Sequence, residues 1–106
     1  MNFKELKELN LGDNNISDIS VLEKVKFEKL ENLNLNYNEI SNINILKSVN
    51  FKELKELNLF KNNISDISVL EKVKFEKLEK FNLRGNKIDK NKFSSIIKKF
   101  KFIIKF

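Results

Sequence analysis

The chain has 106 residues, contains no cysteine, histidine, tryptophan or proline, and carries a formal net charge of +6. This composition excludes a disulfide framework, a thiolate zinc site and a histidine general base. The length fits one domain over residues 1–106, and no stretch approaches the length that crosses a membrane. The first residues show no basic segment leading into a long apolar run, so we expect a cytoplasmic protein.

The positive charge is concentrated in the C-terminal quarter. From Lys80 to the end there are nine basic residues and one acid, a net of +8, whereas residues 1–79 carry 12 basic and 14 acidic residues, a net of −2. A localised basic end attracts acidic partners, nucleic acid or anionic lipid. Nucleic acid and anionic membrane are disfavoured here, because the segment lacks arginine-rich and aromatic-platform features and its phenylalanines fit the core of a cap better. Lysines that keep an apolar terminal segment soluble explain the charge more simply.

One pattern of apolar residues recurs at a constant spacing, and its copies open on Phe3, Phe27, Phe51 and Phe75. Each phenylalanine is followed by leucines three, six and eight positions later, with Phe81 as the exception. We number the copies 1 to 4, and they span residues 3–26, 27–50, 51–74 and 75–88. A period of this length indicates a solenoid, because each unit is too small to bury its apolar face alone and must stack on its neighbours.

Copy 1 carries, in this order, Leu6, Leu9, Leu11, Asn14, Ile16, Ile19 and Leu22. This pattern resembles the short leucine-rich repeats of internalin-like bacterial proteins, and it covers about four fifths of the chain. The resemblance implies an α/β repeat solenoid, a right-handed coil with a short parallel sheet on its concave side and 3₁₀ or short helical turns on its convex side. The pattern weakens in copy 4, where Phe81 replaces a leucine and the frame is lost after Ile88, so we expect the array to end there.

Within each copy the residues themselves predict a strand and a turn. Leu9, Asn10 and Leu11 alternate apolar and polar side chains with a period of two, which predicts a short strand. The following segment has apolar residues at every third position, which favours a tight 3₁₀ or short α-helical turn. Copies in register therefore predict a parallel sheet.

Two asparagine positions recur in every copy. The resemblance implies that the first is an internal ladder that bonds the turn backbone through both donor and acceptor, made of Asn14, Asn38, Asn62 and Asn86. The second position lies between the two strand leucines and so projects from the concave face. There we expect the amides to bond one another along the sheet, in a column of Asn10, Asn34, Asn58 and Asn82.

Residues 2–31 and 50–79 have the same sequence except at two positions, so two successive copies form a longer double repeat. The two differences place Gly12 against Phe60 and Asp13 against Lys61, just after the second strand leucine. Where a scaffold is held constant and one face varies, that face is the best candidate for recognition.

The candidate partner-binding surface is therefore the concave face, and it runs from acidic to basic. It comprises Glu8, Asn10, Gly12, Asp13, Asn32, Asn34, Asn36, Tyr37, Glu56, Asn58, Phe60, Lys61, Lys80, Asn82 and Arg84. Tyr37, Phe60 and Arg84 are the leading anchors, because aromatic residues and arginine are enriched at interfaces. Drift at tolerant exposed sites is the competing explanation.

The two ends of the array differ. Residues 89–106 are expected to cap copy 4, beginning with an amphipathic helix whose apolar residues are Phe93, Ile96, Ile97 and Phe100. The run from Lys101 to Phe106 either adds a fifth strand or remains an exposed edge that seeks a partner. The repeats begin directly at Phe3, which leaves the stacking face of copy 1 without a lid. We therefore expect a homodimer or larger assembly through the N-terminal repeat face or the C-terminal edge.

These features lead to a non-catalytic protein-protein interaction module that presents a variable concave surface to a protein partner. Catalysis is disfavoured because the carboxylates recur at repeat positions among lysines, whereas a catalytic pair needs two different environments. No cofactor and no metal are expected. The alternative is a self-assembling structural repeat scaffold, or a designed or consensus-like repeat protein, that oligomerises through its uncapped ends.

Overall fold

A short strand centred on the first strand leucine, or on Phe81 in copy 4, forms in each copy in a computed structural model that describes residues 3–106. The strands are β1 (Glu8–Asn10), β2 (Asn32–Asn34), β3 (Glu56–Asn58) and β4 (Lys80–Asn82). Neighbouring strands run parallel, and equivalent residues of successive copies are partners, so Leu9, Leu33 and Leu57 lie side by side. The predicted parallel sheet is confirmed.

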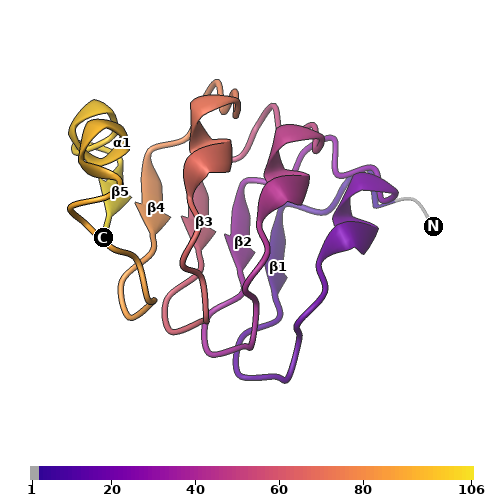
Figure 1. Cartoon of the computed structure of the whole chain (residues 1–106). Helices are drawn as coiled ribbons and strands as arrows, with labels where there is room; N and C mark the ends of the chain where they lie inside the picture. The colour runs from indigo at the N-terminus through magenta and orange to yellow at the C-terminus, as the bar shows by residue number, and fades with distance from the viewer. Residues whose placement is uncertain (1–2) are drawn as a thin grey trace.

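The return segments form the predicted 3₁₀ turns, η1 (Ser20–Glu23), η2 (Asn44–Lys47) and η3 (Ser68–Glu71). They stack on the side of the coil opposite the sheet, as Figure 1 shows. Before η1, the Asp18 carboxylate accepts a hydrogen bond from the Ser20 N–H at 2.9 Å. We call the outer face of the sheet, which points away from these turns, the concave face.

The core lies between the sheet and the turns, and coils on both sides are needed to close it. In the middle of the stack, Leu54 and Ile64 of copy 3 are 0% exposed. The equivalent Leu6 and Ile16 of copy 1 are only half-buried, although the two copies have almost the same sequence. Burial in this fold therefore depends on neighbouring coils, as the solenoid interpretation predicts.

The internal asparagine ladder is also confirmed, and it joins consecutive coils. The Asn62 side-chain nitrogen donates to the Leu59 carbonyl of its own coil at 3.1 Å and to the Leu35 carbonyl of the preceding coil at 3.0 Å. Its side-chain oxygen accepts from the Ile40 N–H at 3.0 Å. Asn38 and Asn86 make the equivalent bonds. One buried amide thus satisfies turn groups of two coils at once.

A helix and a fifth strand close the C-terminal end of the stack (Figure 1). The helix α1 spans Ser94–Lys99, and β5 (Ile104–Lys105) pairs in parallel with β4. The Leu83 N–H donates to the Lys105 carbonyl at 2.7 Å. Of the two fates expected for the tail, the fifth strand is therefore the one observed. None of the helices within residues 3–106 has the length and apolar character needed to cross a bilayer.

Phe81 fits the array to this cap. Its side chain is 1% exposed and meets the Phe75 ring edge to face, with 6.3 Å between centroids. Phe93 and Ile104 are buried in the same core. The expectation that the terminal phenylalanines fill the cap is wrong for Phe102, which is 89% exposed because it lies in the turn before β5.

Candidate partner-binding surface

The structure brings the fifteen candidate residues together on the concave face and on the turn that follows each strand. In register across the sheet, the first strand position holds Glu8, Asn32, Glu56 and Lys80, and the third holds Asn10, Asn34, Asn58 and Asn82. The turn residues include the exposed Asp13, Tyr37, Lys61 and Arg84. In copies 1 and 2 the turn and strand residues line the same hollow and so form one surface.

The concave asparagines bond their own turns, which corrects the expected ladder of amides along the sheet. The Asn58 side-chain oxygen accepts from the Phe60 N–H at 2.9 Å, two positions further along the chain. Asn10, Asn34 and Asn82 make the same bond in their copies. This local bond competes successfully because a short side chain reaches the second N–H along the chain without moving the strand. These residues therefore shape the turns.

The residue that ends each turn adopts a left-handed backbone conformation. The φ angles are 59° for Asp13, 52° for Tyr37, 56° for Lys61 and 75° for Gly85. This conformation costs roughly 1–2 kcal/mol for a residue with a side chain, and glycine avoids the cost. The turn is fixed by bonds to the next coil, such as that from the Tyr37 N–H to the Phe60 carbonyl at 2.9 Å. Copies 1 to 3 thus keep a side chain at a position where glycine would give less backbone strain.

Tyr37 and Phe60 form an aromatic pair on this surface. Their ring centroids are 5.5 Å apart and the ring planes are at 82°, an edge-to-face arrangement. Tyr37 remains 50% exposed. The Lys61 ammonium lies 5.9 Å from the centroid of the Phe60 ring. The two rings and the lysine therefore form a cluster at the edge of the concave face, on the turns that follow β2 and β3.

Charge changes sign across the surface, as the sequence predicts. Glu8 and Asp13 are exposed near β1, whereas Lys80 and Arg84 are exposed near β4. The Lys80 ammonium lies 3.9 Å from the Glu56 carboxylate, a distance at which an exposed pair contributes little to stability. The fifth strand adds Lys105, which is exposed and pairs in register with Asn82. Lys105 could not be assigned to this surface from the sequence, because the position of the tail was open.

A shallow hollow of about 370 Å³ lies over β1 and β2. Its lining consists of Asn10, Gly12, Asp13, Asn34, Asn36 and Tyr37. The hollow is open because Gly12 has no side chain where copy 3 has Phe60. A Cβ atom at Gly12 would collide with the Asn36 amide oxygen. A larger residue at this position would therefore close part of the hollow and displace the Asn36 side chain.

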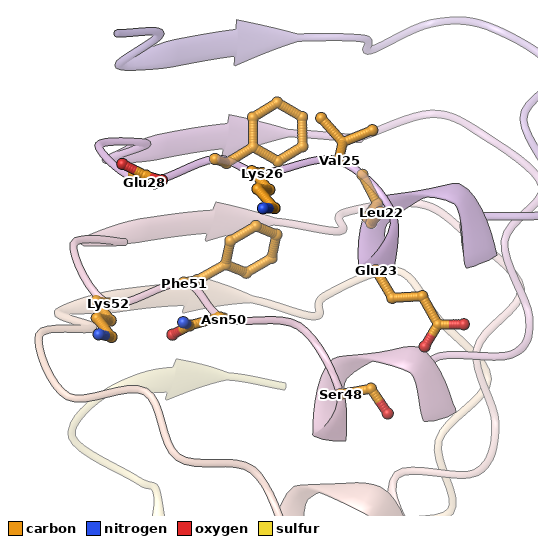
Figure 2. A pocket seen from close by; sticks show the side chains of 10 residues that line it. Leu22, Glu23, Val25, Lys26, Glu28, Ser48, Asn50, Phe51 and Lys52 are labelled. Carbon is orange, nitrogen blue, oxygen red and sulfur yellow. The ribbon is translucent and has the colours of Figure 1, made fainter. Parts of the chain in front are cut away.

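A larger groove of about 580 Å³ lies between residues 22–28 and residues 48–52, two neighbouring segments in which the chain passes from a 3₁₀ turn back to the next strand (Figure 2). Phe27 and Phe51 line it but are only 5% and 4% exposed, so their rings belong to the core. Its exposed residues carry both signs, with Glu23 and Glu28 beside Lys26 and Lys52. The groove is built mainly from positions that recur in other copies. It therefore offers less to distinguish partners than the concave face.

The ionisable groups with shifted pKa values lie in turns and between coils. The pKa values of Asp18 and Asp66 are lowered, first because the backbone N–H groups of Ser20 and Ser68 donate to them. The pKa of Glu53 is lowered by its hydrogen bond from Lys77, whose own pKa is raised by the same bond. These groups therefore cap turns or pair coils. Residues 3–106 contain no cluster of three His, Cys, Asp or Glu side chains that could hold a metal ion.

Comparison with known proteins agrees with this architecture. The family described as "Leucine Rich repeats (2 copies)" matches residues 4–48 and 52–97, and the chain therefore belongs to the leucine-rich-repeat family. The crystal structure of an internalin (inlF) from Listeria monocytogenes is similar, with a TM-score of 0.69 and 34% sequence identity. The match covers 88% of this chain but 26% of that one, so this chain spans about a quarter of the internalin. A comparison with curated protein sequences found no match.

Proposed function

We propose that the chain is a non-catalytic binding module that holds a protein partner against its concave face. Leucine-rich-repeat proteins of this fold serve as protein interaction modules, and the internalin similarity supports the same class here. The observation that carries the proposal is the position of the differences between copies 1 and 3. Both differences fall at the concave edge, and at the second of them Asp13 and Lys61 keep their side chains despite left-handed backbone geometry. Such strain at an exposed site favours a functional explanation over drift.

The size of the surface limits the contact. Five strands about 4.8 Å apart give a sheet roughly 19 Å across, and the strands are short. The area of the sheet is therefore smaller than the standard interface of about 800 Å² per partner. The partner therefore also contacts the turn residues that border the sheet. The aromatic pair on the turns of the two middle copies would provide the main anchors, with Arg84 on the basic side.

A capture experiment with variants on opposite faces tests this proposal. The concave variant combines Tyr37→Ala, Phe60→Ala and Arg84→Ala, and the control combines the exposed convex substitutions Val21→Ala, Lys47→Ala and Lys72→Ala. We expect a protein retained by the wild type to be retained by the control and lost by the concave variant. Equal retention by the wild type and both folded variants would contradict the proposal.

The exposure of Phe3 in copy 1 favours a second candidate, in which two chains associate through their N-terminal repeat faces. Phe3 is 37% exposed, whereas its equivalents Phe27 and Phe51 are 5% and 4% exposed. The C-terminal edge is the other possible contact, where Phe102 is exposed beside β5. Static light scattering over a range of concentrations distinguishes these cases. If the N-terminal face is the contact, association should weaken in a Phe3→Gln variant. If the C-terminal edge is the contact, it should weaken in a Phe102→Gln variant. A constant mass of 12.6 kDa at all concentrations would contradict both.

A further inference from the structure

The hollow over β1 and β2 combines open space, an acidic group and an aromatic ring. Asp13 is the charged side chain in its lining, and the other lining side chains are the half-exposed Tyr37 ring and three asparagine amides. The amide oxygens of Asn10 and Asn34 already accept the N–H groups of Gly12 and Asn36. The Asp13 carboxylate, the Tyr37 ring and the Asn36 amide are therefore the groups that a ligand in the hollow would meet.

Copy 3 shows how the equivalent space is used when these residues differ. Phe60 and Lys61 stand there in place of Gly12 and Asp13, and the Lys61 ammonium lies 5.9 Å from the Phe60 ring centroid. The chain thus places a cation of its own against an aromatic ring at one turn. At the corresponding turn of copy 1 it provides a carboxylate, empty space and the neighbouring Tyr37 ring.

We propose that this hollow binds a lysine or arginine side chain of the protein partner, an inference that rests on the proposed function of the concave face. The Asp13 carboxylate attracts the cation by charge, and the Tyr37 ring attracts it through its quadrupole. Gly12 supplies the room. Asp13 repels an acidic side chain of the partner. Such a side chain is attracted instead to the β4 and β5 end of the sheet, where Lys80, Arg84 and Lys105 lie. A bound segment therefore places its basic residue over β1 and β2 and its acidic residues over β4 and β5.

Two small probes of the same shape test the charge requirement. The full chain is titrated at low salt with N-acetyl-arginine methylamide and with its neutral analogue N-acetyl-citrulline methylamide, and backbone amide signals are followed by NMR. We expect the arginine probe to shift the signals of Gly12, Asp13 and Tyr37 and to bind about threefold to tenfold more tightly than the citrulline probe. Equal binding of the two probes, or no shift at these residues, would overturn the inference.

The sequence of copy 3 provides a matched variant. Gly12→Phe with Asp13→Lys gives copy 1 the residues that copy 3 already holds within the same fold, so the chain should fold while the hollow is filled. We expect the arginine shifts to disappear. Asp13→Asn keeps the hollow open and should bring the affinity for the arginine probe down to that for the citrulline probe. Unchanged arginine binding in either folded variant would refute the assignment, whereas the capture experiment still decides whether the concave face binds protein.

Discussion

At the scale of single residues, two kinds of asparagine perform different tasks. Asn62 is buried and bonds groups of two coils, whereas Asn58 is half-buried and bonds the N–H of Phe60 in its own turn. The sequence predicts the first role by resemblance, because an amide after a strand must satisfy turn groups. It fails on the second role, since identical spacing fits both a ladder across strands and a local turn. Only the side-chain conformation decides between them.

The ladder asparagines should differ in their contribution to stability. Replacing Asn62 by Ala leaves the buried Ile40 N–H without its partner and removes one of the two amide bonds to the Leu35 carbonyl, which keeps its bond from Asn38. This should lower the free energy of unfolding by about 1–3 kcal/mol. Asn14 is exposed and bonds the carbonyls of Leu11 and Gly12 within its own coil, so Asn14→Ala should cost less than about 1 kcal/mol. Urea unfolding measures both. Equal losses of unfolding free energy in the two variants would contradict the claim that the buried ladder asparagines contribute more to stability than the exposed one.

The left-handed turn positions give a second test at this scale. Gly85 has a φ of 75°, and a Cβ atom there would lie 2.9 Å from the Lys61 Cδ atom and 3.2 Å from its backbone nitrogen. Gly85→Ala should therefore destabilise the chain by about 1 kcal/mol or more. Lys61→Gly should be neutral or stabilising by up to about 1 kcal/mol, because glycine relieves the strain at a φ of 56°. Thermal unfolding should show a lower Tm for Gly85→Ala and an unchanged or higher Tm for Lys61→Gly, and a lower Tm for both variants would argue against backbone strain.

At the scale of elements, adjacent copies carry opposite charges at equivalent positions. Glu5 of copy 1 faces Lys29 of copy 2 at 3.1 Å, and Glu53 of copy 3 faces Lys77 of copy 4 at 2.8 Å. At this position odd copies carry an acid and even copies a base, and the signs are reversed where Lys55 of copy 3 faces Glu31 of copy 2. Each exposed pair contributes little, but like charges in register would repel between every pair of coils. Alternation therefore favours stacking odd copies on even ones.

The turns that begin with Asp18 and Asp66 should respond to acid. Hydrogen bonds from Ser20 and Ser68 lower the pKa of these carboxyls below the ordinary value of 3.8. A group with a lower pKa in the folded state stabilises it above 3.8, and this contribution is lost as the pH falls through the folded pKa. Stability measured against pH should therefore drop in this acidic range.

Asn42 supplies the matched replacement, because it bonds the Asn44 N–H at 2.9 Å in the same turn of copy 2. The variant Asp18→Asn with Asp66→Asn should fold, and its urea midpoint should fall less steeply below about pH 4 than that of the wild type. Identical slopes in the two proteins would show that these carboxyls do not contribute.

At the scale of the whole molecule, the sequence repeat predicts that the coils stack in one solenoid. How completely the apolar residues of a coil are buried depends on the coils next to it. The strands, the 3₁₀ turns and the internal ladder all follow from positions that recur from copy to copy. The sequence could not predict that Ile104 and Lys105 form a strand, because so short a run becomes a strand only by pairing with the free edge of β4. The aromatic pair was likewise hidden, since Tyr37 and Phe60 belong to different copies and meet only through the register of two coils.

The central claim is that recognition resides on the concave face. It can be tested most directly with the photoreactive residue p-benzoylphenylalanine, placed singly at Tyr37 on the concave face and at Val21 on the convex side, which are 50% and 57% exposed. Irradiation in the presence of the captured partner should give a covalent product from position 37 and none from position 21. A product from position 21 alone, or equal products from both positions, would contradict the account.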